Sequence, residues 1–350
     1  MSAKRIILAV TAALVAATTL TACDPPYPPE LLEAFYDQNP VCETGNVPVS
    51  VDQNLSTLVP SWQDTMTGSC PDMSISIASS ASNVNISSDL NSIKSPNVYA
   101  YAPYFVDAGV ATVTFASGTV INFSLKSLFD ILSGKITTWN APELAKENPQ
   151  LKIPSSPITV NPEADSEALA ALENWAKLEG VAVPSTLLTT PKPNLNFDLT
   201  TSGEGEISIV RLSTAEAASV APSAIVVNDK YLKGTVLASD SSAYSGASQF
   251  VSKSKAGKVS LKLDRTLSPE PPKGADKADL PYSAVFFGWI SLSGKDNTLD
   301  RSVARFLLRS DEQGILSQGS IGILPTAIRI SSLDAVSVGL KLPKMKVKKP

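Results

Sequence analysis

The sequence predicts an α/β fold built as two lobes with a cleft between them. Short runs alternate apolar and polar residues, which is the pattern of strands. Between them lie longer segments whose apolar residues recur every three or four positions, which is the pattern of amphipathic helices. This order favours parallel sheets joined by right-handed crossovers. The chain after residue 22 is also long enough for two regions of ordinary domain size.

In the first half of the chain, the folded part is expected to begin at about residue 46. A helix is predicted over residues 56–66, starting near the pair Ser56-Thr57. A second helix over residues 124–132 has four apolar side chains on one face. β-Branched residues and alternation predict strands over residues 47–51, 73–78, 98–102 and 110–115.

In the second half, a helix over residues 165–178 has apolar residues spaced for burial, and Ser213 with Glu216 forms a capping-box pattern that opens a short helix. Residues 252–278 are charged and Pro-rich, which predicts a surface loop or a β-excursion. An amphipathic helix over residues 299–310 is expected to continue to 317. The strands predicted here are residues 158–160, 207–210, 224–227 and 283–292.

The N-terminus has the three parts of an export signal. Lys4 and Arg5 precede an apolar run over residues 6–20, which is shorter than the roughly 20 apolar residues of a membrane span. Small residues then lead to Cys23 in the order L-T-A-C. This end resembles the lipobox of bacterial lipoproteins, which implies cleavage before Cys23 and a lipid anchor on its thiol. The alternative is an ordinary signal peptide with an incidental cysteine.

These features divide the chain into a signal peptide, a tether, a two-lobed domain and a tail. The tether is rich in proline, and the tail is basic. The expected limits are 1–22 for the signal peptide, 23–45 for the tether, about 46–120 with 283–335 for lobe 1, about 121–282 for lobe 2, and 336–350 for the tail.

Composition excludes several classes of function. The 29 basic and 33 acidic residues form no basic excess, which argues against a nucleic-acid partner. Histidine is absent, so a His-based triad, a His metal ligand and a His proton shuttle are all excluded. No nucleophile motif is present either. We therefore expect no enzymatic activity, no metal, no cofactor and a monomeric protein.

Cys42 and Cys70 are the two cysteines left after the anchor. An even pair in an exported protein predicts a disulfide, which would stabilise the fold by roughly 3–4 kcal/mol through the loop it closes. Two free thiols are the alternative. A pair of cysteines without histidine is a poor metal site.

Residues 133–142 read S-G-K-I-T-T-W-N-A-P and resemble a segment of the phosphate-binding proteins that serve ABC importers. Residues 207–212, followed by Ser-Thr-Ala, and residues 307–325, which end I-G-I-L-P, resemble two further parts of that family. The similarity runs from about residue 46 to residue 326. It implies a type II periplasmic-binding-protein fold, with two α/β lobes, a hinge and a central cleft.

The phosphate-binding motif of that family, R-x-D-G-S-G-T, is mostly missing here. An ungapped match places Pro162 at the arginine position and keeps Ser166 alone, while Asp165 and Glu167 replace two glycines. Those carboxylates stabilise the positive end of a helix, but they repel an anion. A retained phosphate site would need a different register, or Arg211 as the missing cation.

The resemblance places a few hydroxyl groups where the family binds its ligand. The tentative ligand-binding residues are Ser56, Thr57, Ser80, Ser82 and Ser166. For each one, helix capping or loop solvation is the alternative.

The expected function is a lipid-anchored, substrate-binding lipoprotein on the extracytoplasmic face of the cell membrane. Its partners would be an ABC permease and a small polar or anionic solute, with phosphate disfavoured. The alternative is a non-transporting interaction or structural lipoprotein that retains the fold.

Overall fold

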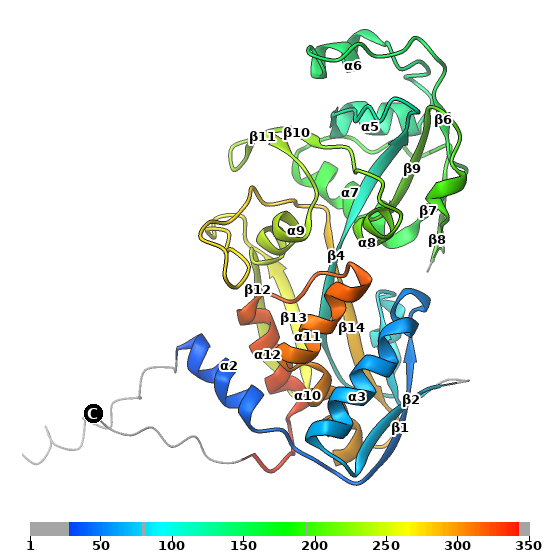
Figure 1. The fold of residues 1–350 in the computed structure, drawn as a ribbon. Coiled ribbons are helices and arrows are strands. Elements are labelled where there is room, and N and C mark those ends of the chain that lie inside the picture. The colour runs from blue at the N-terminus through cyan, green and yellow to red at the C-terminus, as the bar shows by residue number, and fades with distance from the viewer. Residues whose placement is uncertain (1–27, 79–81, 194, 196, 343–350) are drawn as a thin grey trace, which may run out of the picture.

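The computed structural model describes residues 28–78, 82–193, 195 and 197–342, so the lipobox with Cys23 lies outside the described residues. The α/β fold class is confirmed. The largest sheet in this part of the chain has the order β12-β13-β4-β14-β3-β1-β2, with β9 joined to β4 and β6 to β9 (Figure 1). Its strands are β1 (Gly45–Val51), β2 (Met73–Ile77), β3 (Val84–Ser87), β4 (Val98–Thr114), β6 (Thr159–Val160), β9 (Glu206–Arg211), β12 (Phe250–Lys255), β13 (Lys258–Leu263) and β14 (Val285–Ser293).

Strand β4 connects the two lobes as one continuous and almost wholly buried element. Its first part pairs with β14, and Gly109 to Thr114 pair with β9, both antiparallel. The sequence predicted two separate strands here, and that prediction was wrong. Trp289 pairs with Pro103 and Gly288 with Phe105, so Tyr104 is an extra residue. Such a bulge tolerates proline, which has no N–H to donate to the ladder.

Gly109 lies where β4 passes under helix α7 (Ser166–Leu178). A Cβ atom at this position would lie 2.1 Å from the carbonyl oxygen of Ala168. Only glycine therefore allows the helix backbone to approach the strand so closely. This contact holds the start of α7 beside the crossing between the lobes.

Lobe 2 forms the upper part of Figure 1, around the second half of β4. Its smaller sheets have the orders β11-β10-β5 and β7-β8. Their strands are β5 (Phe123–Ser124), β7 (Glu163–Asp165), β8 (Thr190–Lys192), β10 (Ile225–Asn228) and β11 (Lys233–Val236). The helices around them are α5 (Leu125–Leu132), α6 (Pro142–Glu147), α7, η2 (Leu199–Thr201), α8 (Leu212–Ala217) and α9 (Asp240–Ala247).

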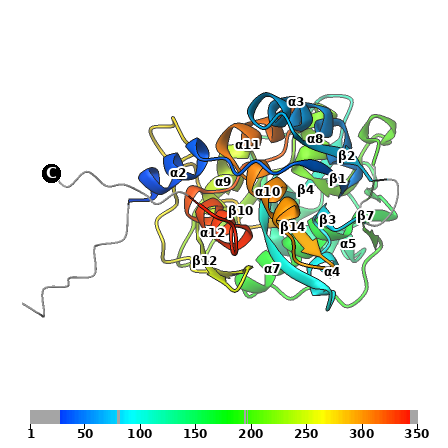
Figure 2. The same cartoon turned by 90° about the horizontal axis from the view of Figure 1, so that it is seen from below.

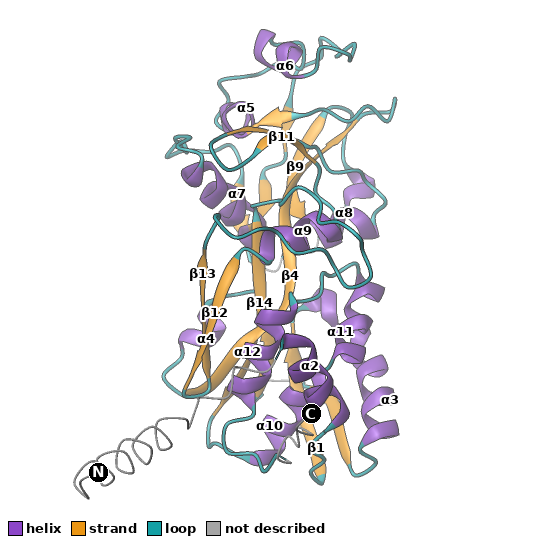
Figure 3. Ribbon diagram, turned by 90° about the vertical axis from the view of Figure 1, so that its left-hand side faces the viewer, coloured by secondary structure: helices purple, strands orange, loops and turns teal. Residues whose placement is uncertain are grey.

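The predicted β-excursion is the hairpin β12–β13. Its turn brings Lys258 beside Tyr101, whose N–H donates to the carbonyl of Gly257 at 3.0 Å. The hairpin therefore lies next to β4 and β14 in the sheet of lobe 1 (Figure 3), although the sequence had counted these residues with lobe 2. The other limits of the lobes stay a prediction.

Two predicted helices are divided in the structure. The helix expected over residues 56–66 is the 3-10 helix η1 (Gln53–Leu58) followed by α3 (Val59–Ser69), which carries a proline in its first turn. The helix expected over residues 299–317 is α10 (Thr298–Leu307) followed by α11 (Ser310–Leu316). The remaining elements of this lobe are α4 (Asn91–Lys94), η3 (Ser317–Gly319) and α12 (Thr326–Val336).

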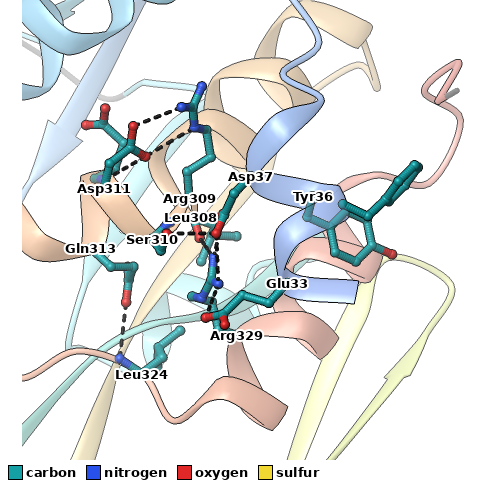
Figure 4. A network of polar contacts seen from close by, with 12 residues as sticks. Glu33, Tyr36, Asp37, Leu308, Arg309, Ser310, Asp311, Gln313, Leu324 and Arg329 are labelled. Atoms are coloured by element: carbon teal, nitrogen blue, oxygen red, sulfur yellow. Dashed lines mark hydrogen bonds and ion pairs between the residues drawn. The ribbon is translucent and has the colours of Figure 1, made fainter. Parts of the chain in front are cut away.

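Helix α2 (Pro29–Gln38) falls in the predicted tether, yet it is docked beside α12 (Figure 2). Arg329 of α12 is 3% exposed and donates to the carboxylate of Asp37 at 3.0 Å, to the carbonyl of Leu308 at 3.0 Å and to Glu33 (Figure 4). Burial would raise the pKa of Asp37, but the Arg329 and Ser310 donors outweigh it and hold that pKa below its ordinary value.

Replacing Arg329 with Met is expected to release α2 from the domain. The substitution leaves the half-buried carboxylate of Asp37 without its cation and that of Glu33 with the exposed Lys273 alone, which should lower the free energy of unfolding by about 2–4 kcal/mol. Chymotrypsin cleavage at Phe35 or Tyr36 should become faster, and thermal melting measures the stability.

Lys273→Met is the matched control, because Lys273 pairs with the same Glu33 at 3.7 Å but is 78% exposed. An exposed pair contributes about 1 kcal/mol or less. Equal melting temperatures and cleavage rates for the two variants would contradict the docking role of Arg329.

The predicted disulfide is confirmed between Cys42 and Cys70. It joins the segment after α2 to the end of α3, across a sequence separation of 28 residues. In the described part of the chain, no helix has both the length and the apolar character that crossing a membrane requires.

Candidate functional site

Strand ends from both lobes converge on the crossing of β4. Asp52 follows β1, Asp165 ends β7 and caps α7, and Arg211 ends β9. Asp107 lies inside β4, two residues before Gly109, where the pairing changes from β14 to β9. In open α/β sheets, ligands bind beyond the carboxyl ends of strands, where helix N-termini point. This is therefore the candidate ligand site of the fold.

Arg211 is the cation at this site, and it is 4% exposed. Its Nε donates to Asp165 at 2.7 Å, one terminal nitrogen donates to Glu167 at 3.0 Å, and the other lies 3.9 Å from a carboxylate oxygen of Asp52. We call Arg211 with Asp52, Asp107, Asp165 and Glu167 the Arg211 cluster. Its guanidinium is already bound by the chain's own carboxylates.

Two carboxylates of the Arg211 cluster, Asp165 and Asp52, are also held by other donors. Asp165 accepts hydrogen bonds from the N–H groups of Glu167 and Ala168 at the start of α7. Asp52 accepts from both the N–H and the hydroxyl of Ser88. The carboxylates are therefore positioned by the backbone and do not depend on Arg211 alone for their placement.

The titration of the cluster reflects its burial. Burial would lower the pKa of Arg211, but the carboxylates of Asp165 and Asp107 outweigh it and raise that pKa. Burial raises the pKa of Asp107 to about 6, against the lowering effects of Ser213 and Arg211. Burial, followed by the neighbouring Asp165, raises the pKa of Glu167. At neutral pH the cluster still holds more negative than positive charge.

Ser213 has a different role from the predicted one. The sequence indicated a capping box with Glu216, but the hydroxyl of Ser213 donates to Asp107 at 2.6 Å, and α8 begins at Leu212 with Arg211 as its N-cap. A buried carboxylate in the neighbouring strand competes successfully for the hydroxyl. The result is a further link between β4 and β9 at the candidate site.

A cavity of about 640 Å³ adjoins the Arg211 cluster. It lies between α7, the end of β3, the hairpin β12–β13 and β14. Most of its lining is apolar, and the apolar residues include Leu261, Phe286, Phe287, Trp289 and Leu178. Volumes of 300–1,000 Å³ and apolar walls with a few polar groups are typical of small-molecule sites.

Several polar residues of the cavity lie where it meets the Arg211 cluster. Ser88 binds Asp52, and Glu167 binds Arg211, so both lining residues belong to the contacts of the cluster. Phe286 lies between cavity and cluster, with the Arg211 guanidinium 5.4 Å from its ring centre. From Glu167 to Lys177 the cavity follows α7 for about 15 Å, at 1.5 Å of helix rise per residue.

Of the predicted ligand residues that the structure describes, one lies at this place. Ser166 opens α7 and lines the cavity. Ser56 donates to the carbonyl of Gln53 within η1, and Thr57 is exposed on the same helix. Ser82 donates to the carbonyl of Pro48 beside a different hollow, and Ser80 lies outside the described residues. A ligand-binding role for these five stays a prediction.

Sequence reasoning missed most of the site. Asp52, Ser88 and Asp107 come from three separate strands, so no local motif connects them. Phe286 and Trp289 were expected as part of an apolar strand, but the strand pattern does not show that their side chains line a cavity. Arg211 was named as a possible replacement for the missing cation of the phosphate motif.

The segment over residues 133–142 has a structural role in lobe 2. Gly134 has a positive φ of 75° and ends α5, which glycine does without strain. Trp139 is fully buried, packs against Phe115 and donates from its indole nitrogen to the carbonyl of Gly205 at 3.1 Å. Within the described ranges, no group of three or more His, Cys, Asp or Glu residues could hold a metal ion.

Comparison with known proteins gives a match at the level of structure. No family model and no curated protein matches the sequence. A periplasmic phosphate-binding protein solved with bound phosphate is 14% identical, with a TM-score of 0.50 over 81% of this chain and 92% of the other.

Two human-derived structures give similar values. An ancestral soluble variant of the human phosphate-binding protein is 12% identical, with a TM-score of 0.50 over 84% of this chain and 93% of the other. A human phosphate-binding apolipoprotein is 12% identical, with a TM-score of 0.50 over 83% and 93% of the two chains. At this identity the likeness shows the fold, and the protein has the type II periplasmic-binding-protein fold of the phosphate-binding proteins.

Proposed function

We propose that this protein is a solute-binding lipoprotein of the ABC-importer type that is related to phosphate-binding proteins but has lost the phosphate site. One observation carries the proposal: Arg211, the buried cation of the cleft, is bound by Asp165 and Glu167. These carboxylates take the place that an oxyanion would occupy beside a guanidinium.

The electrostatic cost of a bound phosphate supports this proposal. A phosphate near Arg211 would meet the carboxylates of Asp165, Glu167 and Asp52 around the same guanidinium. Each repulsion at about 4 Å costs roughly 4 kcal/mol at an intermediate dielectric. The bidentate guanidinium contact that would offset it is already used. A ligand of this protein is therefore not a small free oxyanion.

Anchoring through Cys23 would hold the domain close to the membrane. Helix α2 begins at Pro29, so five residues separate Cys23 from the docked helix in the sequence. Five extended residues reach at most about 18 Å. The docked helix thus supports a short and oriented attachment, as a binding protein that meets a permease would need.

Wild-type protein is expected to bind neither phosphate nor sulfate. Calorimetric titration of the mature chain carrying Cys23→Ser should give no binding up to about 1 mM anion, because Arg211 is neutralised. The double variant Asp165→Asn with Glu167→Gln should gain anion binding, because it frees the guanidinium while Asn still caps α7.

The control variant Glu143→Gln with Glu173→Gln loses the same number of charges outside the cluster. It should stay silent in the same titration. Phosphate binding to the wild-type chain in the micromolar range would overturn the loss of the phosphate site.

A second candidate function is a non-transporting interaction lipoprotein. The contact between Arg211, which ends β9, and Asp52, which follows β1, favours this candidate. Through this contact the chain's own side chains link the two lobes, which in a binding protein is the role of the ligand. Titration with a panel of sugars, amino acids, amines and short peptides separates the candidates. A ligand held well below about 1 mM supports solute binding, and silence across the panel favours the interaction role.

A further inference from the structure

We propose that the cavity beside the Arg211 cluster binds an organic amine, with the hydrocarbon or aromatic body in the cavity and the positive group at the end formed by Glu167, Ser166 and Ser88. This inference rests on the proposed solute-binding function and gives the chemical class of its ligand.

The shape and walls of the cavity favour an apolar body. Its floor is made by Phe287 and Trp289 of β14, which are each 7% exposed, and Leu261 and Phe250 of the hairpin complete the wall. The cavity follows α7 for about 15 Å. Leu178, an exposed apolar side chain, lies at its outer end. Covering these surfaces with a hydrocarbon removes apolar area from water, which is the main favourable term in such binding.

The charge at the inner end favours a positive group. The Arg211 cluster contains four carboxylates and one guanidinium, so it has a formal charge of 1 − 4 = −3 when all are ionised. Glu167 belongs to the cluster and also lines the cavity, and Asp89 adds a further carboxylate to the lining. Phe286 offers an aromatic face at the same end, which attracts ammonium groups.

The cations of the described lining do not cancel this charge. Lys177 is the basic residue among them, and it is 61% exposed, at the opposite end of α7 from Glu167, and paired with Glu173 at 3.7 Å. Arg211 lies behind Phe286 and is bound by its own carboxylates. The inner end would therefore repel the carboxylate of an acid. An uncharged alcohol would leave the negative charge of the inner end unbalanced.

Three probes that differ only in their polar group test the inference: 4-phenylbutylamine, 4-phenylbutanol and 4-phenylbutyrate. The mature chain with Cys23→Ser is titrated with each by calorimetry, and by the fluorescence of Trp289 in the cavity wall. We expect the amine to bind about tenfold tighter than the alcohol, and the acid to bind weakest.

Two pairs of variants locate the binding. Ala170→Trp fills the cavity from an exposed position of α7 and should abolish amine binding, whereas Ala145→Trp on α6 is exposed and remote and should not. Glu167→Gln should reduce the preference for amine over alcohol by about fivefold or more. Glu143→Gln, which removes the same charge from an exposed position of α6 outside the lining, should leave that preference unchanged.

Each remaining outcome overturns the inference. Equal affinity for the three probes would show that the charge of the probe does not matter. Amine binding that persists in Ala170→Trp would show that the amine does not bind in the cavity. If no probe binds at about 5 mM but another solute binds and is lost in Ala170→Trp, the amine class is wrong and the solute-binding function stands. If the wider panel is also silent, both proposals fail together.

Discussion

Replacing Arg211 with Met is expected to lower the free energy of unfolding by about 3–5 kcal/mol, and the melting temperature by roughly 10 °C. The substitution leaves the carboxylates of Asp165 and Asp52, 3% and 5% exposed, without their cation. Their backbone and hydroxyl donors remain, but the positive charge that balances their burial is gone. Thermal and denaturant unfolding of the mature chain measure the loss.

Two further variants separate charge from packing. Lys126→Met removes a cation from an exposed ion pair and should cost about 1 kcal/mol or less. Adding Asp165→Asn and Glu167→Gln to Arg211→Met should restore part of the stability, because fewer unbalanced carboxylates remain. A melting temperature for Arg211→Met within about 2 °C of wild type would contradict a structural role for the cluster.

Replacing Glu312 with Gln is expected to stabilise the protein at alkaline pH and to change little near pH 5. Glu312 of α11 is fully buried, and its carboxylate oxygens have no hydrogen-bond partner among the described residues. Burial raises its pKa to about 8, and Asp311 adds to the rise while Arg309 opposes it. The hydroxyl of Tyr104, whose own pKa is raised well above its ordinary value by burial, is also without a described partner nearby.

The direction of the effect follows from proton linkage. Below the unfolded pKa both states are protonated, so Glu312 makes no pH-dependent contribution. Between the unfolded pKa and the folded value of about 8, the folded state binds more protons, and its stability falls as the pH rises. Above that value the folded state has the full free-energy cost of burying the ionised Glu312 carboxylate. Gln stays neutral and removes about 2–4 kcal/mol of this cost.

Melting temperatures of wild type and Glu312→Gln from pH 5 to pH 9 test this expectation. Asp107 and Glu216, whose pKa values burial raises to about 6 and about 7, also destabilise the fold as the pH rises, so the difference between the two proteins isolates Glu312. Glu143→Gln controls for the loss of a carboxylate at an exposed position. A stability gain that is constant across this range would refute a buried titrating group.

Fold class was predictable because it depends on periodic patterns that survive without tertiary information. Alternation marked β1 and β2, an apolar run marked β14, and the apolar faces of α5 and α7 marked those helices. Strand β4 was divided in the prediction because Pro103 interrupts its pattern, and only the bulge opposite Gly288 shows how the strand continues. Helix α2 was predicted as part of a tether, since the ion pairs that dock it come from Arg329, far along the chain.

The site was less predictable than the fold, and the reason is physical. Asp165 and Glu167 signalled the loss of the phosphate motif, because their charges can be read from the local sequence. The partners of Arg211 could not be read in that way, since Asp52 and Asp107 come from other strands. The hydroxyl of Ser213 could cap its own helix or bind Asp107, and only the packing of β4 against β9 decides between these outcomes.

The sequence by itself determined the α/β class, the pairing of Cys42 with Cys70, and the expectation that phosphate is a poor ligand, because each depends on spacing or on charges that are close in the chain. The tertiary structure alone decided what replaces the phosphate site. Burial brings carboxylates from separate strands around one guanidinium and places an apolar cavity beside them. Both features are made by residues far apart in sequence, whose mutual distances no local pattern contains.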